Sequence, residues 1–151
     1  MTTITASTAA YDAIHVGDEL PKLQKTESQE TINNYNALNR RGDPPPTQGK
    51  NLHTDEEYAK QGIFAGTVNL GVVTCAYMME ALQLAFPTQN VLRSTFTMRA
   101  LEPFRPGDLV TFGGKVLAKR EESGNRFVDA EISGVNQLGQ TIATAKVTVP
   151  L

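Results

Sequence analysis

The stretch VNLGVVTCAYMMEALQLAF, residues 68–86, decides the fold because it is the most apolar segment of the chain. Apolar side chains would occupy nearly the whole circumference of the helix it forms, and Pro87 follows at once. A helix that is apolar on all sides is buried, and the residue before a proline is disfavoured in helical geometry. The sequence therefore predicts a long central helix that is covered by the rest of the chain.

Downstream of this helix, apolar and polar residues begin to alternate near Leu92. Turn-forming residues interrupt the alternation at 106–108, 123–125 and 137–139. A period of two is typical of strands with one buried face, and short turns join antiparallel neighbours. We expect four consecutive strands in an antiparallel meander, and hence an α+β fold in which a curled sheet wraps around the central helix.

Upstream of the central helix, the sequence predicts a strand, a helix and a loop. The strand is expected over residues 20–25, and an amphipathic helix over 29–40 begins after Ser28. Residues 43–50 contain three consecutive prolines and no periodicity. Proline fixes the backbone and removes a hydrogen-bond donor, so this segment is expected to be an exposed loop.

A short helix is expected between this loop and the central helix. Thr54 and Glu57 have the spacing of a capping box, and Gly62 ends a predicted helix over residues 55–61. His53, one of two histidines in the chain, directly precedes it. A titratable side chain ahead of a buried helix is an arrangement that acyl chemistry uses, so His53 is the first candidate for a functional residue.

The composition indicates one domain, because 151 residues are enough for one core and too few for two. We place this domain at residues 16–151, behind a flexible tail or short docking arm at 1–15. A net charge of −2 argues against nucleic acid or an anionic membrane as the main partner. The single cysteine, Cys75, excludes an internal disulfide. Because neither a signal-peptide pattern nor an apolar run of membrane-spanning length occurs, we expect a cytoplasmic protein.

Three stretches of the chain share a pattern with a known family. They are Gly42 and Asp43 after a helix containing Tyr35 and Leu38; His53, Asp55 and Ala59 before Gly62; and residues 104–109. With them, residues 16–149 resemble the MaoC-like or (R)-specific enoyl-CoA hydratase family. The resemblance implies a single hot-dog fold and a homodimer or a dimer of dimers. It also implies an acyl-CoA or acyl-carrier-protein thioester as the substrate, with no metal or redox cofactor.

In that family, an aspartate and a histidine five residues later share acid–base catalysis, and a glycine at the start of the central helix binds the substrate oxygen through its amide. The resemblance assigns acid–base catalysis to Asp43 and His53. It assigns binding of the substrate and its oxygen to Gly71 and Gly66. His53 and Gly71 are eighteen residues apart, as expected for the family. Asp43 lies ten residues before His53, and the residue five before it is Gln48, which cannot act as a general base.

The implied activity is the hydration or dehydration of an acyl thioester. This reaction needs an activated water, a proton for the α-carbon and stabilisation of the enolate oxygen. Two alternatives stay open: a catalytically silent subunit that binds an acyl ligand or completes a partner's site, and a related lyase or isomerase of a biosynthetic pathway. A thioesterase would need a carboxylate near the amino end of the central helix. The only carboxylate in that helix, Glu80, lies too far from this end.

Each candidate residue also has a purely structural interpretation. His53 could be a surface histidine beside a helix cap, and Asp43 a turn residue before proline. Asp55 is best explained as an acid in the first turn of a helix, where it favours the helix dipole. Arg40 and Arg41 would complement the carbonyl groups at a helix end. With His53 nearly alone, no cluster of metal ligands is expected.

Overall fold

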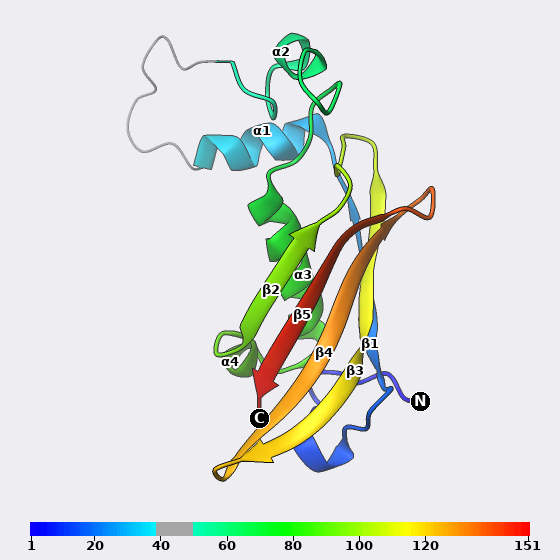
Figure 1. Cartoon of the computed structure of the whole chain (residues 1–151), viewed down its shortest axis with the longest axis vertical. Helices are drawn as coiled ribbons and strands as arrows, with labels where there is room; N and C mark the ends of the chain where they lie inside the picture. The colour runs from blue at the N-terminus through cyan, green and yellow to red at the C-terminus, as the bar shows by residue number, and fades with distance from the viewer. Residues whose placement is uncertain (39–49) are drawn as a thin grey trace.

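The computed structural model describes residues 1–38 and 50–151, and its main feature is one antiparallel sheet that curls around a long helix (Figure 1). The strands are β1 (Glu19–Thr26), β2 (Thr95–Ala100), β3 (Leu109–Glu122), β4 (Asn125–Asn136) and β5 (Thr141–Pro150). The helices are α1 (Gln29–Leu38), α2 (Glu56–Lys60), α3 (Gly71–Ala85) and α4 (Thr88–Val91), with a 3-10 turn at Tyr11–Ala13. The predicted α+β class with a curled sheet around a central helix is confirmed.

The strand order differs from the predicted meander. Within the described residues, the sheet has the order β1-β3-β4-β5-β2, with all neighbours antiparallel. Only β3, β4 and β5 follow one another directly, whereas β2 pairs with β5 at the far edge from β1. The expectation of four consecutive paired strands was wrong because the alternation in a sequence identifies a strand without identifying its neighbour. The chain between β2 and β3 must therefore pass across the end of the sheet.

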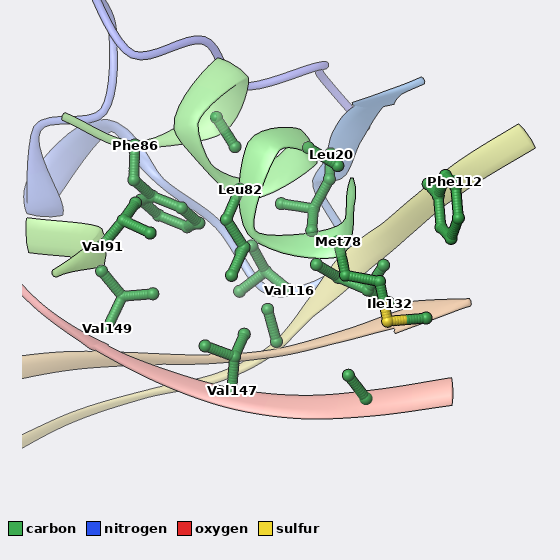
Figure 2. Packing of buried hydrophobic residues seen from close by; sticks show 14 of the residues in the cluster. Leu20, Met78, Leu82, Phe86, Val91, Phe112, Val116, Ile132, Val147 and Val149 are labelled. Carbon is green, nitrogen blue, oxygen red and sulfur yellow. The ribbon is translucent and has the colours of Figure 1, made fainter. Parts of the chain in front are cut away.

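The core lies between α3 and the concave face of the sheet. Figure 2 shows Met78, Leu82 and Phe86 of the helical segment among side chains from four strands. The sheet residues labelled there are Leu20, Phe112, Val116, Ile132, Val147 and Val149, all of them buried. Full burial of a large apolar side chain stabilises a protein by roughly 1.5–3 kcal/mol. This packing fixes the middle and carboxyl-terminal half of α3 against the sheet.

Helix α3 is shorter and less completely covered than residues 68–86 suggest. It begins at Gly71, so the predicted first three residues form part of the preceding segment, and it ends at Ala85 ahead of Pro87. Val72 in its first turn and Leu84 near its end are exposed. The apolar pattern correctly marks a helix with a buried face, but the helix also presents apolar side chains outward.

The amino-terminal segment is packed against the domain. Ile4 and Ile14 are both buried in the core. The Ile4 amide donates to the Glu19 carbonyl at 3.0 Å, and the Ala6 amide donates to the Leu84 carbonyl at 2.9 Å. Residues 1–15 thus contribute two core side chains, where the sequence suggested a flexible tail or docking arm.

Helix α2 has a different cap from the predicted one. Asp55 is the N-cap residue, and its carboxylate accepts the Tyr58 amide at 2.8 Å. The expected cap, Thr54, lies outside the helix, and Asp55 precedes the first turn instead of belonging to it. The structural role expected for Asp55 stands, but it acts by satisfying a free amide directly. This cap holds the segment that follows His53.

Candidate active site

A cavity of about 360 Å³ opens at the amino end of α3. Apolar side chains and the crossover segment between β2 and β3 form most of its wall, and His53, Asn69, Thr74 and Glu102 are its polar members. The complete lining consists of Leu52, His53, Phe64, Val68, Asn69, Gly71, Thr74, Ala100, Leu101, Glu102, Pro103, Phe104 and Ile142. A concave, mainly apolar site with a few convergent polar groups is typical of small-molecule binding.

His53 is held in this wall by several hydrogen bonds. Its backbone amide donates to Asn51 Oδ1 at 2.9 Å, and its carbonyl accepts from Gln29 Nε2 at 2.7 Å. The ring Nδ1 lies 2.9 Å from the Val68 carbonyl oxygen. Because a carbonyl only accepts, Nδ1 carries the hydrogen in this bond, and the neutral ring keeps a lone pair on Nε2. His53 is therefore oriented to take a proton at Nε2.

The first residue of α3, Gly71, lines the same cavity. Leu70 is the N-cap and provides no side-chain acceptor. In the part of the chain that the structure describes, the amides of Gly71 and Val72 have no hydrogen-bond partner. Outside the backbone of its own helix, a Cβ atom built on Gly71 would meet no other atom within 4 Å, so the space where a side chain would stand is open. Free amides at a helix start favour a negatively charged or carbonyl oxygen.

Gly66 does not line the cavity with Gly71. It is buried, and a Cβ atom at this position would lie 3.4 Å from Arg105 Nη1. The Arg105 guanidinium donates to the Phe64 carbonyl oxygen, so it ties the loop before α3 to the crossover segment. The structure places Gly66 in this loop contact, and its part in substrate binding stays a prediction.

Asp43 lies outside the described residues, and so do Gly42, Arg40, Arg41 and Gln48. The pairing of Asp43 with His53 therefore stays a prediction.

A buried polar cluster that the sequence did not reveal lies behind the cavity wall. Glu27 follows β1 directly and is 1% exposed, while Asn69 and Thr74 are 7% and 4% exposed. Burial raises the pKa of Glu27, although hydrogen bonds from the Ser28 amide and from Asn69 act in the opposite direction. A glutamate at the end of a partly exposed strand is normally solvated, so the sequence did not predict that Glu27 is buried. Asn69 did give one, as a polar residue between Val68 and Leu70.

A larger hollow, of about 620 Å³, lies elsewhere on the sheet. Its polar lining is dominated by residues such as Arg99, Lys115 and Glu131, of which Lys115 and Glu131 form an ion pair with each other. It contains neither histidine and no helix start. The smaller cavity is therefore the better candidate, because His53 and Gly71, whose amide is free among residues 1–38 and 50–151, both line it. Within the described residues, no group of three His, Cys, Asp or Glu side chains is arranged to hold a metal ion.

No protein-family model and no curated protein matches the sequence. Solved structures do match the fold. A MaoC-like dehydratase from Rhodospirillum rubrum has a TM-score of 0.75 at 21% identity, over 93% of this chain and 94% of that one. The (R)-hydratase from A. caviae involved in PHA biosynthesis has a TM-score of 0.71 at 20% identity, over 90% and 96%. The ChsH1–ChsH2 complex from Mycobacterium tuberculosis gives 0.69 at 19% identity, over 89% and 96%.

This chain has the hot-dog fold of the MaoC-like dehydratases and (R)-hydratases. The fold implied by the sequence resemblance is thereby confirmed. Among the described residues, no helix combines the length and the apolar character needed to cross a bilayer.

Proposed function

We propose that this protein is a MaoC-like hydratase or dehydratase of acyl thioesters. The observation that carries the proposal is the convergence of His53 and the free Gly71 amide on one largely apolar cavity at the start of α3. An acyl chain would occupy the apolar part of this cavity. The likeness in fold to proteins described as dehydratases and hydratases supports the same reaction class.

The proposed chemistry uses His53 as the proton acceptor and donor. In the hydration direction, Nε2 removes a proton from water while the water oxygen attacks the β-carbon of the enoyl thioester. Negative charge then develops on the thioester oxygen, where the Gly71 N–H donates a hydrogen bond. A proton is delivered to the α-carbon, and in the reverse direction the same groups remove water. Asp43 is proposed to share the proton transfers with His53.

The substrate would be linked to CoA or to an acyl carrier protein, and the protein would act as a homodimer or a dimer of dimers. These two features come from the family that the sequence resembles. A cytoplasmic location belongs to the same proposal.

A second candidate function is a catalytically silent subunit that binds an acyl ligand or completes a partner's site. The observation that favours it is Gln48 five residues before His53, where the family has its aspartate. The similarity in fold to the ChsH1–ChsH2 complex, which is named for two different chains, agrees with a subunit that acts together with a partner. A thioesterase is disfavoured because Glu80 does not line the cavity and forms an ion pair with Lys25 at 2.7 Å.

The decisive assay follows the loss of enoyl absorbance when the purified protein is mixed with short and medium trans-2-enoyl-CoA substrates. We expect turnover by the wild type, and a large loss in His53→Ala and in Asp43→Asn. Activity that is unchanged in both variants would refute the proposed pair. An inactive wild type that still binds a saturated acyl-CoA would favour the silent subunit.

A further inference from the structure

Three buried polar side chains form a chain of contacts that leads into the cavity. Glu27 lies behind the wall, Asn69 precedes α3 by two residues, and Thr74 is in the first turn of the helix. Asn69 and Thr74 line the cavity together with His53 and Gly71, whereas Glu27 does not. A polar group surrounded by apolar atoms is costly unless it is hydrogen-bonded, so this cluster needs a physical explanation.

Asn69 is hydrogen-bonded to both of the other side chains in the cluster. Asn69 Nδ2 donates to Glu27 Oε2 at 3.4 Å and to Thr74 Oγ1 at 3.1 Å. Thr74 Oγ1 also lies 3.2 Å from Asn69 Oδ1, to which it can donate. When Glu27 is ionised, its carboxylate can only accept, and it then turns the NH₂ group of Asn69 toward itself. The position of the amide is fixed further by the backbone, because the Asn69 amide donates to the Phe104 carbonyl at 2.8 Å.

In the structure the Thr74 hydroxyl donates its hydrogen to Asn69 Oδ1, and a ligand oxygen in the cavity could replace that acceptor. When the O–H group rotates from Asn69 Oδ1 toward the cavity, Oγ1 still accepts from Asn69 Nδ2, and the hydrogen bond to Asn69 Oδ1 is exchanged for one to the ligand. Thr74 is three residues after Gly71, and residues with this spacing lie on the same side of a helix. Side chains in a helix also tilt toward its amino end. Thr74 and Gly71 both line the cavity at the start of the helix.

The burial of Glu27 is difficult to explain by stability alone. Burial raises the pKa of this carboxyl group, which means that its charged form is disfavoured in the fold. Buried polar groups of this kind are often no better for stability than apolar residues of similar volume. A role in function would explain the buried glutamate. Glu27 would hold Asn69 in one orientation, and Asn69 would in turn position the Thr74 hydroxyl to donate into the cavity.

We propose that Thr74 donates a hydrogen bond to the thioester carbonyl oxygen, as a second donor beside the Gly71 amide, and that Asn69 and Glu27 are its positioning residues. The proposal rests on the proposed function for the kind of ligand it names. It adds that the protein recognises the carbonyl oxygen of an acyl thioester through a side chain as well as through the backbone.

The test compares two ligands that differ only in this oxygen. Hexanoyl-CoA carries the thioester carbonyl, and the thioether hexyl-CoA lacks it. Isothermal titration calorimetry should show that the wild type binds hexanoyl-CoA more tightly. In Thr74→Val, which keeps the shape and removes the hydroxyl, the ratio of the two dissociation constants should fall about tenfold. Thr74→Ser should retain most of the preference because it keeps the hydroxyl.

The positioning residues are tested with the same ligand pair. Asn69→Leu removes the partner of the hydroxyl, and the preference should fall about threefold to fivefold. In Glu27→Gln the side-chain amide can both donate and accept, so the orientation of Asn69 is no longer fixed, and a loss of about threefold is expected. Thr148→Val is the matched control, since its hydroxyl bonds Asp129 and Thr148 does not line the cavity. It should leave the preference unchanged.

Each outcome decides the proposal. A wild type without a preference, or one that binds neither ligand, overturns it, as does Thr74→Val with an unchanged preference. If Thr74→Val does not fold, Asn69→Leu and Glu27→Gln decide, and a preference retained in both overturns the inference. A clear preference that Thr74→Val abolishes, in a protein that hydrates no enoyl-CoA, would support this inference while refuting the proposed function.

Discussion

Strand β1 is flanked by a buried carboxyl group at each end, and the two are held in different ways. Asp18, before the strand, accepts the backbone amides of Thr2 at 3.0 Å and His15 at 2.8 Å. Glu27, after the strand, accepts the Ser28 amide at 3.1 Å and the more distant Asn69 side chain at 3.4 Å. Hydrogen bonds from Thr2 and His15 lower the pKa of Asp18, whereas burial raises the pKa of Glu27.

The difference separates a structural end of the molecule from the end that carries the candidate site. At the Asp18 end, the carboxylate fastens the amino-terminal segment to the sheet. At the Glu27 end, the carboxyl group lies behind the cavity that His53 lines. It accepts a hydrogen bond from Asn69, whose side chain lines that cavity. Each end also has one of the two histidines of the chain, His15 and His53. The comparison can be tested by changing equivalent residues at the two ends.

The largest expected contrast is between the two histidines. His53→Ala should lower kcat/KM for a trans-2-enoyl-CoA by about 10²- to 10⁴-fold, because it removes the proposed acid–base group. His15→Ala should have little effect, since its side chain is 72% exposed and lies at the Asp18 end. Steady-state kinetics of both variants provides the measurement. Equal losses in the two variants would contradict the assignment of the site to the Glu27 end.

The next contrast concerns packing. Ile14 is fully buried at the Asp18 end, and Ile14→Ala should lower the free energy of unfolding by about 2–5 kcal/mol. Ile63, in the loop before α3, is 93% exposed, and Ile63→Ala should change this energy by less than about 0.5 kcal/mol. Urea denaturation of both variants measures the difference. A small effect of Ile14→Ala would show that the amino-terminal segment is not part of the stable core.

Asp18 should make the stability of the fold depend on pH in the acid range. Its pKa in the folded protein lies below the ordinary value of 3.8, so its stabilising contribution is present above that range and is lost as the pH falls through the folded pKa. At neutral pH, Asp18→Asn should lower Tm by several degrees, on the order of the effect of a lost hydrogen bond in a domain of this size. The difference from the wild type should shrink in acid. Asp12→Asn, at an exposed residue, should show no such pattern.

Glu27 should give the smallest effect, with the opposite sign. Its folded pKa lies above the ordinary value of 4.5, so the protein is more stable with Glu27 protonated, and this stability is lost as the pH rises through the folded pKa. The Tm of Glu27→Gln relative to wild type should therefore increase with pH. Thermal unfolding across this range measures it, with Glu30→Gln on the exposed side of α1 as the control. A difference that decreases with pH would mean that Glu27 is stabilised as a carboxylate.

Much of the fold could be predicted because its signals are local. The apolar run with a following proline identified α3, and the alternation with turn residues identified β3, β4 and β5. The place of β2 at the far edge could not be predicted, since pairing depends on contacts between distant residues. The short helix α4 was missed because four residues are too few to show a helical period.

The candidate site was predictable only in part. His53 and Gly71 line one cavity, because His53 lies just before α2 and Gly71 begins α3, whereas their roles in catalysis and oxygen binding stay predictions. The cluster of Glu27 and Thr74 was not predictable, since the two are far apart in sequence and each is unremarkable alone. The capping pattern predicted Thr54 as the N-cap, but the structure has Asp55 there. Aspartate is as good a cap as threonine, so the sequence alone does not decide between these neighbours.

The place of β2 at the sheet edge has a consequence for the order of folding. The segment from Ala100 to Phe104 runs from that edge back toward β3, and it forms one wall of the cavity. Two of its amides, those of Leu101 and Glu102, bond the Ile142 carbonyl of β5, and its Phe104 carbonyl accepts the Asn69 amide. This wall can exist only after strands distant in the chain have paired, and such contacts form slowly. We expect ligand binding to return late in refolding, after the helix and the β3–β4 hairpin have formed.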